Sequence, residues 1–160
     1  MQDLVENHKF INSNSKCFMN FWKELRKKLT IDLSDQLHLE MVTNFWSQSP
    51  ISTRAIDWDA PHLWPNPWEL INDFKFDESS VALGMFYTLM LSHDQRWTLD
   101  RMELMLVKDH VRQIQQIILK VDNQWLLNLE YNSVLDSKKI TNNYIVQQRY
   151  SFDGKIHLPK

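Results

Sequence analysis

The sequence predicts an α+β protein in which N-terminal helices pack on a C-terminal antiparallel β-sheet meander. Apolar residues recur at helical spacing through the first part of the chain, and beyond Trp97 the pattern changes to that of strands. No linker rich in Pro, Gly or Ser separates the two parts. At 160 residues the chain has the usual size of one domain. We therefore expect a single domain over residues 1–160, with a helical part over 1–93 and a strand-rich part over 98–160.

Two amphipathic helices are predicted near the N-terminus. The first carries one apolar stripe at positions i, i+3, i+4, i+7 and i+11, formed by Phe18, Phe21, Trp22, Leu25 and Leu29. The second begins after Ser34, which is a good N-terminal cap, and ends before Pro50. Both helices are expected to lie on a core.

A short third helix is predicted from Pro67 to about Asp73. Asn66 can cap it, Pro67 suits the first helical position, and Glu69 completes a capping box three residues after the cap.

The fourth helix is expected to run from an Asp77 cap to about Ser92. Its residues are apolar nearly all round, which indicates burial on several sides and marks it as the central helix. Gly84 lowers helix propensity by roughly 1 kcal/mol relative to Ala. Its presence therefore predicts the close approach of another element.

Four segments have the pattern of strands: residues 102–107, 115–121, 124–129 and 144–152. A tight turn at Asp122-Asn123 is expected between two of them. Asp153-Gly154 is expected to close a final hairpin onto residues 155–158, because Gly supplies the positive φ of such a turn.

Composition argues against several kinds of function. The net charge of −2 and the lack of a long basic run give no footprint for nucleic acid. Only two glycines are present, too few for the glycine-rich loops that bind nucleotides. The single cysteine, Cys17, excludes an internal disulfide and a thiolate metal cluster.

The chain also lacks other recognisable sites. Its six histidines are scattered without metal-ligand spacing, so neither a metal nor a cofactor is expected. No apolar run approaches ~20 residues, so no membrane contact is expected. The N-terminus has no signal-peptide pattern, and we expect the protein in the cytoplasm of the producing cell or incorporated in a virion.

The long loop between the second and third helices is rich in tryptophan. Aromatic side chains in such a loop either pack down or bind something, and tryptophan is enriched at the energetic centres of interfaces. Trp22, Trp46 and Trp125 fall in helix or strand patterns and are assigned to packing. The residues predicted to contact a protein partner are Trp58, Trp64, Trp68 and Trp97.

A helix from Asp77 to Ser92 followed by "IILKVDNQWLLNLE" (117–130) resembles the transglutaminase-like branch of the papain-type fold. The resemblance implies a catalytic Cys opening the central helix, a His on the following sheet and an Asp or Asn on the next strand. Here that Cys is absent. Ser79, His110 and Asn128 are the vestigial candidates for the three positions, and Ser79 or Ser80 is expected near residues 115–118 with Asn128 close by. No catalytic residue is predicted.

The block "WPNPWELINDFKFDESSVALGMFYTLMLS" (64–92) also resembles segments of small uncharacterised proteins of tailed bacteriophages of marine bacteria. The sequence is therefore interpreted as that of a non-enzymatic structural protein, a bacteriophage virion or assembly component that binds other protein subunits. One alternative is a transglutaminase-like or papain-like hydrolase or transferase that uses Ser79 and His110. Another is a phage-encoded inhibitor of a host protein.

Overall fold

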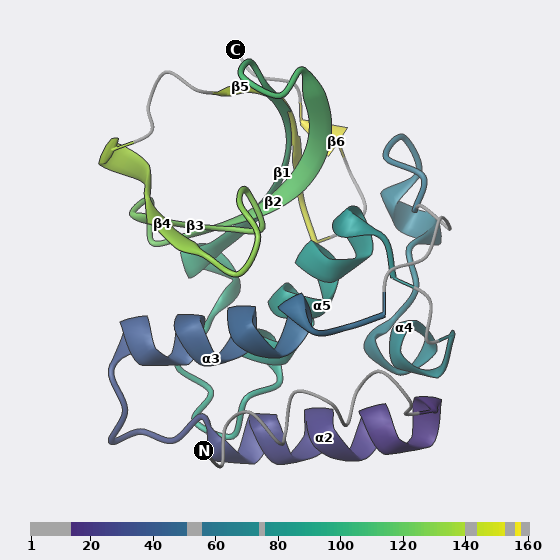
Figure 1. Ribbon diagram of the computed structural model, residues 1–160, viewed down its shortest axis with the longest axis vertical. Coiled ribbons are helices and arrows are strands. Elements are labelled where there is room, and N and C mark those ends of the chain that lie inside the picture. Colours follow the sequence, from purple (N-terminus) through teal and green to yellow (C-terminus); the bar gives the residue numbers. More distant parts are fainter. Residues whose placement is uncertain (1–13, 51–55, 74–75, 140–143, 153–155, 158–160) are drawn as a thin grey trace.

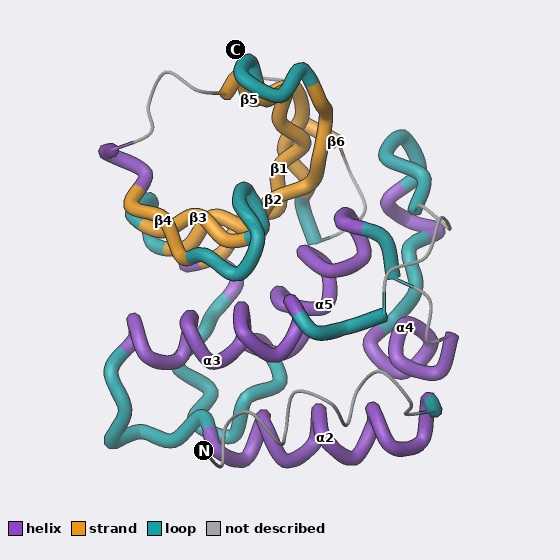
Figure 2. Tube along the Cα trace, in the orientation of Figure 1, coloured by secondary structure: helices purple, strands orange, loops and turns teal. Residues whose placement is uncertain are grey.

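The protein is an α+β fold in which a central helix separates a helical layer from a curled antiparallel sheet (Figures 1 and 2). It is described from a computed structural model over residues 14–50, 56–73, 76–139, 144–152 and 156–157. Figure 1 shows α2, α3 and α4 at one end of the molecule, the sheet at the other, and α5 between them. The predicted fold class is confirmed.

The helices are α2 (Ser15–Lys28), α3 (Asp35–Ser47), α4 (Pro67–Asp73) and α5 (Glu78–Met90). Side chains cap α2, α3 and α5, because oxygens of Asn14, Ser34 and Asp77 accept from amides of the first turn. The capping box of α4 has formed: Asn66 Oδ1 accepts from the Glu69 amide and Glu69 Oε2 accepts from the Asn66 amide, both at 2.9 Å. The ends of α3 and α5 agree with the sequence prediction within two residues, and the bounds of α4 are those predicted.

Helix α5 is buried along nearly its whole length, as predicted. Gly84 lies against Trp46 of α3, and a Cβ added at Gly84 would stand 2.4 Å from the indole ring. The close approach expected of this glycine is therefore present. It allows the backbone of α5 to pack directly on a fully buried tryptophan.

The sheet has the order β4-β3-β2-β1-β5-β6, and every pairing is antiparallel. Its strands are β1 (Met102–Asp109), β2 (Ile114–Val121), β3 (Trp125–Leu127), β4 (Val134–Asp136), β5 (Tyr144–Tyr150) and β6 (Ile156–His157). The first four form a meander, whereas β5 returns to the far side of β1. Strand β4 and the short 3-10 helices η1 (Pro61–Leu63), η2 (Leu99–Arg101) and η3 (Ser137–Lys139) are additions to the predicted elements.

Alternate residues of the central strands belong to two apolar clusters, one on each face of the sheet. Leu104 and Leu106 of β1 and Ile117 of β2 belong to the main core with the helices. Met105 and Ile118 belong to a smaller cluster that fills the other face of the sheet. The curl of the sheet seen in Figure 1 brings β3 and β4 round toward that second face.

Within the part of the chain that the structure describes, no helix is both long and apolar enough to span a membrane. The predicted turn at Asp153-Gly154 lies outside the described residues.

Candidate functional site

The first turn of α5 meets β2 and the end of β3 at a single side chain, Asn128. Its Nδ2 donates to the carbonyl oxygen of Glu78 at 2.6 Å and to that of Ile117 at 3.0 Å. Asn128 has a φ of 69°, in the left-handed region that Asn tolerates better than most residues. The start of the central helix therefore lies next to Asn128 and next to Ile117 of the 115–118 stretch, as expected.

Two serines occupy the first turn of α5, and they have different surroundings. Ser79 Oγ accepts a hydrogen bond of 3.0 Å from Trp58 Nε1. Ser80 lines a cleft, and its backbone amide donates to the capping side chain of Asp77. Each serine is only 2% exposed. The exposed residue that opens the helix is Glu78.

His110 lies apart from these serines. It is an exposed residue of the turn between β1 and β2, and its carbonyl accepts from Gln113 Nε2. The strand position beside Asn128 is Ile117, which is fully buried, and the strand from there to its beginning at Ile114 spans ~10 Å. Among the described residues no hydrogen bond joins His110 to Ser79. The combination of Ser79, His110 and Asn128 remains a prediction.

The cleft that Ser80 lines has a volume of about 440 Å³ and lies between the loop before α4 and the start of α5. Three carboxylates, those of Asp57, Glu69 and Asp73, share its walls with Trp64. Glu69 already serves the capping box of α4, and Asp57 Oδ1 accepts from the Asp59 amide. Two of the three carboxylates thus already accept hydrogen bonds from nearby backbone amides.

A larger cleft of about 960 Å³ lies along the C-terminal half of α5 and is also lined by the ends of β1, β2 and β5. Its floor is aromatic, with Trp64 and Tyr150 rings 4.7 Å apart and Phe86 and Phe152 rings 4.9 Å apart. Burial raises the pKa of Tyr87 in its wall to about 12, so this phenol remains protonated and donates to the Pro65 carbonyl at 2.6 Å. Sequence reasoning missed this cleft, because its walls come from segments far apart in the chain.

The tryptophans predicted to contact a partner differ in how accessible they are. Trp68 is 51% exposed, Trp58 and Trp64 are half-buried, and Trp97 is 2% exposed. Trp64 Nε1 donates to the Asp57 carbonyl at 2.7 Å, so the aromatic loop folds onto itself. Trp97 is core, which removes it as a surface contact. Contact through the other three remains a prediction.

Within the described residues no group of three or more His, Cys, Asp or Glu side chains could hold a metal ion.

Solved structures of LapG from Legionella pneumophila share this fold. One is 18% identical with a TM-score of 0.71 over 91% of this chain and 80% of that chain. A calcium-bound structure is 16% identical with a TM-score of 0.71 over 98% of this chain and 84% of that chain. An EGTA-treated structure is 18% identical with the same TM-score of 0.71 over 91% of this chain and 78% of that chain. No family model and no curated protein matches the sequence.

LapG is a transglutaminase-like, papain-type, calcium-dependent protease. At this identity the likeness establishes the fold alone. It supports the resemblance to the transglutaminase-like branch as a resemblance of fold. The likeness to bacteriophage proteins is not shown.

The interpretation of the chain as a non-enzymatic virion or assembly component is wrong, because the solved structures with this fold are those of a protease. The viral and structural-protein assignments have no support. That interpretation relied on tryptophans as surface contacts. Trp97 instead lies in the core, and Trp58 and Trp64 donate their indole N–H groups to Ser79 Oγ and to the Asp57 carbonyl within the chain.

Proposed function

We propose that the chain is a hydrolase or acyltransferase of the transglutaminase-like fold that attacks an amide or ester carbonyl with the hydroxyl of Ser79. The observation that carries the proposal is the pair of hydrogen bonds from Asn128 to Glu78 and Ile117. They join the start of the central helix to the sheet at the place where the resembled family has its catalytic residues. The fold shared with LapG supports the same class of reaction.

The surroundings of Ser79 favour negative charge. Its Oγ stands in the first turn of α5, where free amides and the helix dipole stabilise an anion. Trp58 Nε1 already donates to this oxygen, and a hydrogen bond to the ionised form of a group favours that form, so this contact eases loss of the hydroxyl proton. In the reaction the Ser79 oxygen bonds to the carbonyl carbon, the leaving amine or alcohol departs with a proton, and water or an amine then removes the acyl group.

Proton transfer limits the rate that this arrangement can reach. A serine hydroxyl becomes a strong nucleophile when a base lies within hydrogen-bond reach, and His110 lies on the exposed turn between β1 and β2. The proton of Ser79 therefore passes to water. Slow turnover is expected, so an activated ester is the substrate class that reveals it, and a fluorophosphonate is the probe that traps the nucleophile.

The test is covalent labelling with a fluorophosphonate, with the modified residue located by mass spectrometry. We expect the label on Ser79, its loss in Ser79→Ala, and normal labelling in Ser80→Ala, which removes a neighbouring hydroxyl of equal burial. Trp58→Phe keeps an aromatic ring and removes the N–H donor to Ser79 Oγ, so labelling should slow by about tenfold or more. His110→Ala should label like the parent.

Three results would overturn the proposal: an unlabelled parent, equal labelling of Ser79→Ala, or a label confined to Ser80. Circular dichroism of each variant separates loss of chemistry from loss of fold.

A further inference from the structure

The imidazole of His38 is fully buried on α3 and is held by one acceptor and one donor. Its Nε2 lies 2.8 Å from the Thr30 carbonyl oxygen, and its Nδ1 lies 3.1 Å from Trp97 Nε1. A carbonyl can only accept and an indole N–H can only donate. The ring proton of neutral His38 therefore resides on Nε2, and the lone pair of Nδ1 accepts the hydrogen bond that the Trp97 indole N–H donates.

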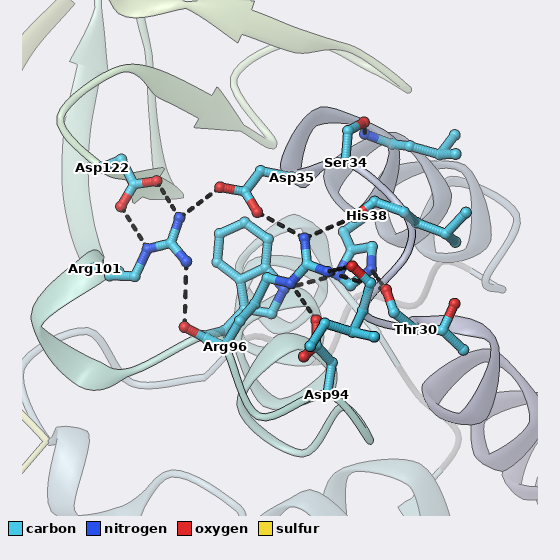
Figure 3. A network of polar contacts seen from close by, with 12 residues as sticks. Thr30, Ser34, Asp35, His38, Asp94, Arg96, Arg101 and Asp122 are labelled. Carbon is cyan, nitrogen blue, oxygen red and sulfur yellow. Dashed lines mark hydrogen bonds and ion pairs between the residues drawn. The ribbon is translucent and has the colours of Figure 1, made fainter.

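A second proton has no place in this arrangement. It would have to occupy Nδ1 and would point at the indole N–H of Trp97. Two donors would then face each other, and the hydrogen bond would be lost. The charged groups round the ring are Arg96, Asp94 and Asp35, and the two carboxylates are both paired with the Arg96 guanidinium (Figure 3). Burial lowers the pKa of His38 below its ordinary value, and the charge of Arg96 acts in the same direction.

The partner of His38, Trp97, lies in the middle of the segment that joins α5 to β1, residues 91–101. Arg96 in this segment donates to the carbonyls of Thr30, Ile31 and Leu33 in the turn before α3. The hydrogen bond between His38 and Trp97 is the buried contact beneath these surface contacts.

The same segment reaches the larger cleft through Arg101. Its guanidinium lies over the Trp97 ring at 4.4 Å, and it binds both Asp35 of α3 and Asp122 of the turn between β2 and β3. Arg101 lines the cleft of about 960 Å³. Trp97 therefore packs directly against a residue in the wall of that cleft.

We propose that His38 is a pH-sensitive latch that fastens residues 91–101 to α3, and with them the Arg101 wall of the larger cleft, and that acidification opens it. Once the segment is released, the imidazole accepts a proton near pH 6.5, its ordinary value, whereas in the closed state it stays neutral. The closed state is fully favoured above about pH 6.5. It loses stability as the pH falls below that value, until the pH reaches the lower pKa of the closed state.

Hydrogen exchange of the Trp97 indole N–H tests the latch in the intact chain. Its NMR signal is identified as the indole peak that disappears in Trp97→Phe. After correction for the intrinsic exchange rate, protection should fall up to tenfold per pH unit between about pH 6.5 and the pKa of closed His38, because one proton is taken up on opening. Peaks of the other indoles, such as that of Trp22, serve as internal references.

Two variants separate the latch from general acid sensitivity. His38→Gln keeps a polar side chain without a titrating group, so the decline of Trp97 protection should vanish. His93→Gln removes an exposed histidine of the same segment and should leave the decline unchanged.

Trp97 protection that is constant with pH in the parent would overturn the proposal, and so would an equal decline in all indoles. If His38→Gln does not fold, the titration of the His38 ring signals in the parent decides. A pKa at or above about 6.5 would contradict a latch that is closed only when His38 is neutral.

Discussion

At the scale of single residues, Thr88 connects the central helix to two neighbouring helices. Its Oγ1 accepts from Trp22 Nε1 of α2 at 2.8 Å and from Trp46 Nε1 of α3 at 2.9 Å. The same hydroxyl donates to the Gly84 carbonyl at 2.6 Å, so its capacity as donor and acceptor is fully used. One buried hydroxyl thus satisfies two buried indole N–H groups, which would otherwise lack partners. Sequence periodicity assigned both tryptophans to the core, but it contains no signal for the polar atom that they share.

We expect Thr88→Val to destabilise the protein by about 2–6 kcal/mol, since Val has the same shape and leaves two buried N–H donors unpaired at about 1–3 kcal/mol each. Thr88→Ser, which keeps the hydroxyl and loses one methyl group, should cost about 1 kcal/mol. Urea unfolding of the parent and both variants measures the free energies. A Val variant as stable as the Ser variant would show that the two hydrogen bonds contribute little.

At the scale of elements, helix ends were predicted well because their signals are local. Asn66, Pro67 and Glu69 act within one turn of backbone, and the capping box they predict has formed. Strand β4 and the return of β5 to β1 were missed for the opposite reason. β4 has only three residues, all half-buried, and the pairing of β5 depends on partners about forty residues away. Hydrophobic pattern gives the length of a strand but not its neighbour.

The cap of α5 provides a prediction at this scale. Asp77 Oδ1 accepts from the Ser80 amide at 2.8 Å, so Asp77→Ala should destabilise the protein by about 1 kcal/mol. Asp77→Asn keeps an equivalent cap and should lie close to the parent. Thermal melts monitored by circular dichroism measure the difference. A loss in the Asn variant as large as in the Ala variant would assign the effect to charge at the helix start instead of to the hydrogen bond.

At the scale of the whole molecule, the fold could be predicted further than the chemistry of its site. The order of elements and the Trp125 region suggested a transglutaminase-like core, and solved LapG structures share the fold over most of both chains. The same resemblance placed Asn128 beside the start of α5, where it lies. The contact of Trp58 with Ser79 could not be foreseen, since a loop residue and a helix residue 21 positions apart meet only through tertiary packing. His110 was chosen as the nearest imidazole in sequence, but β2 puts a buried Ile117 beside Asn128.

Asn128 hydrogen-bonds both to the start of α5 and to β2, and its replacement tests what these two hydrogen bonds contribute. Asn128→Gly tolerates the φ of 69° but loses both hydrogen bonds, so we expect it to destabilise the protein by about 1–3 kcal/mol. Asn128→Ala loses the same bonds and adds the strain of a Cβ in the left-handed region, a further cost of about 1–2 kcal/mol. Urea unfolding orders the two variants, and hydrogen exchange of the first-turn amides of α5 reports whether the helix start has come away from β2. If both variants unfold like the parent, the first turn of α5 is held by the apolar core alone, and the hydrogen bonds from Asn128 do not fix the geometry on which the proposed acyl transfer by Ser79 depends.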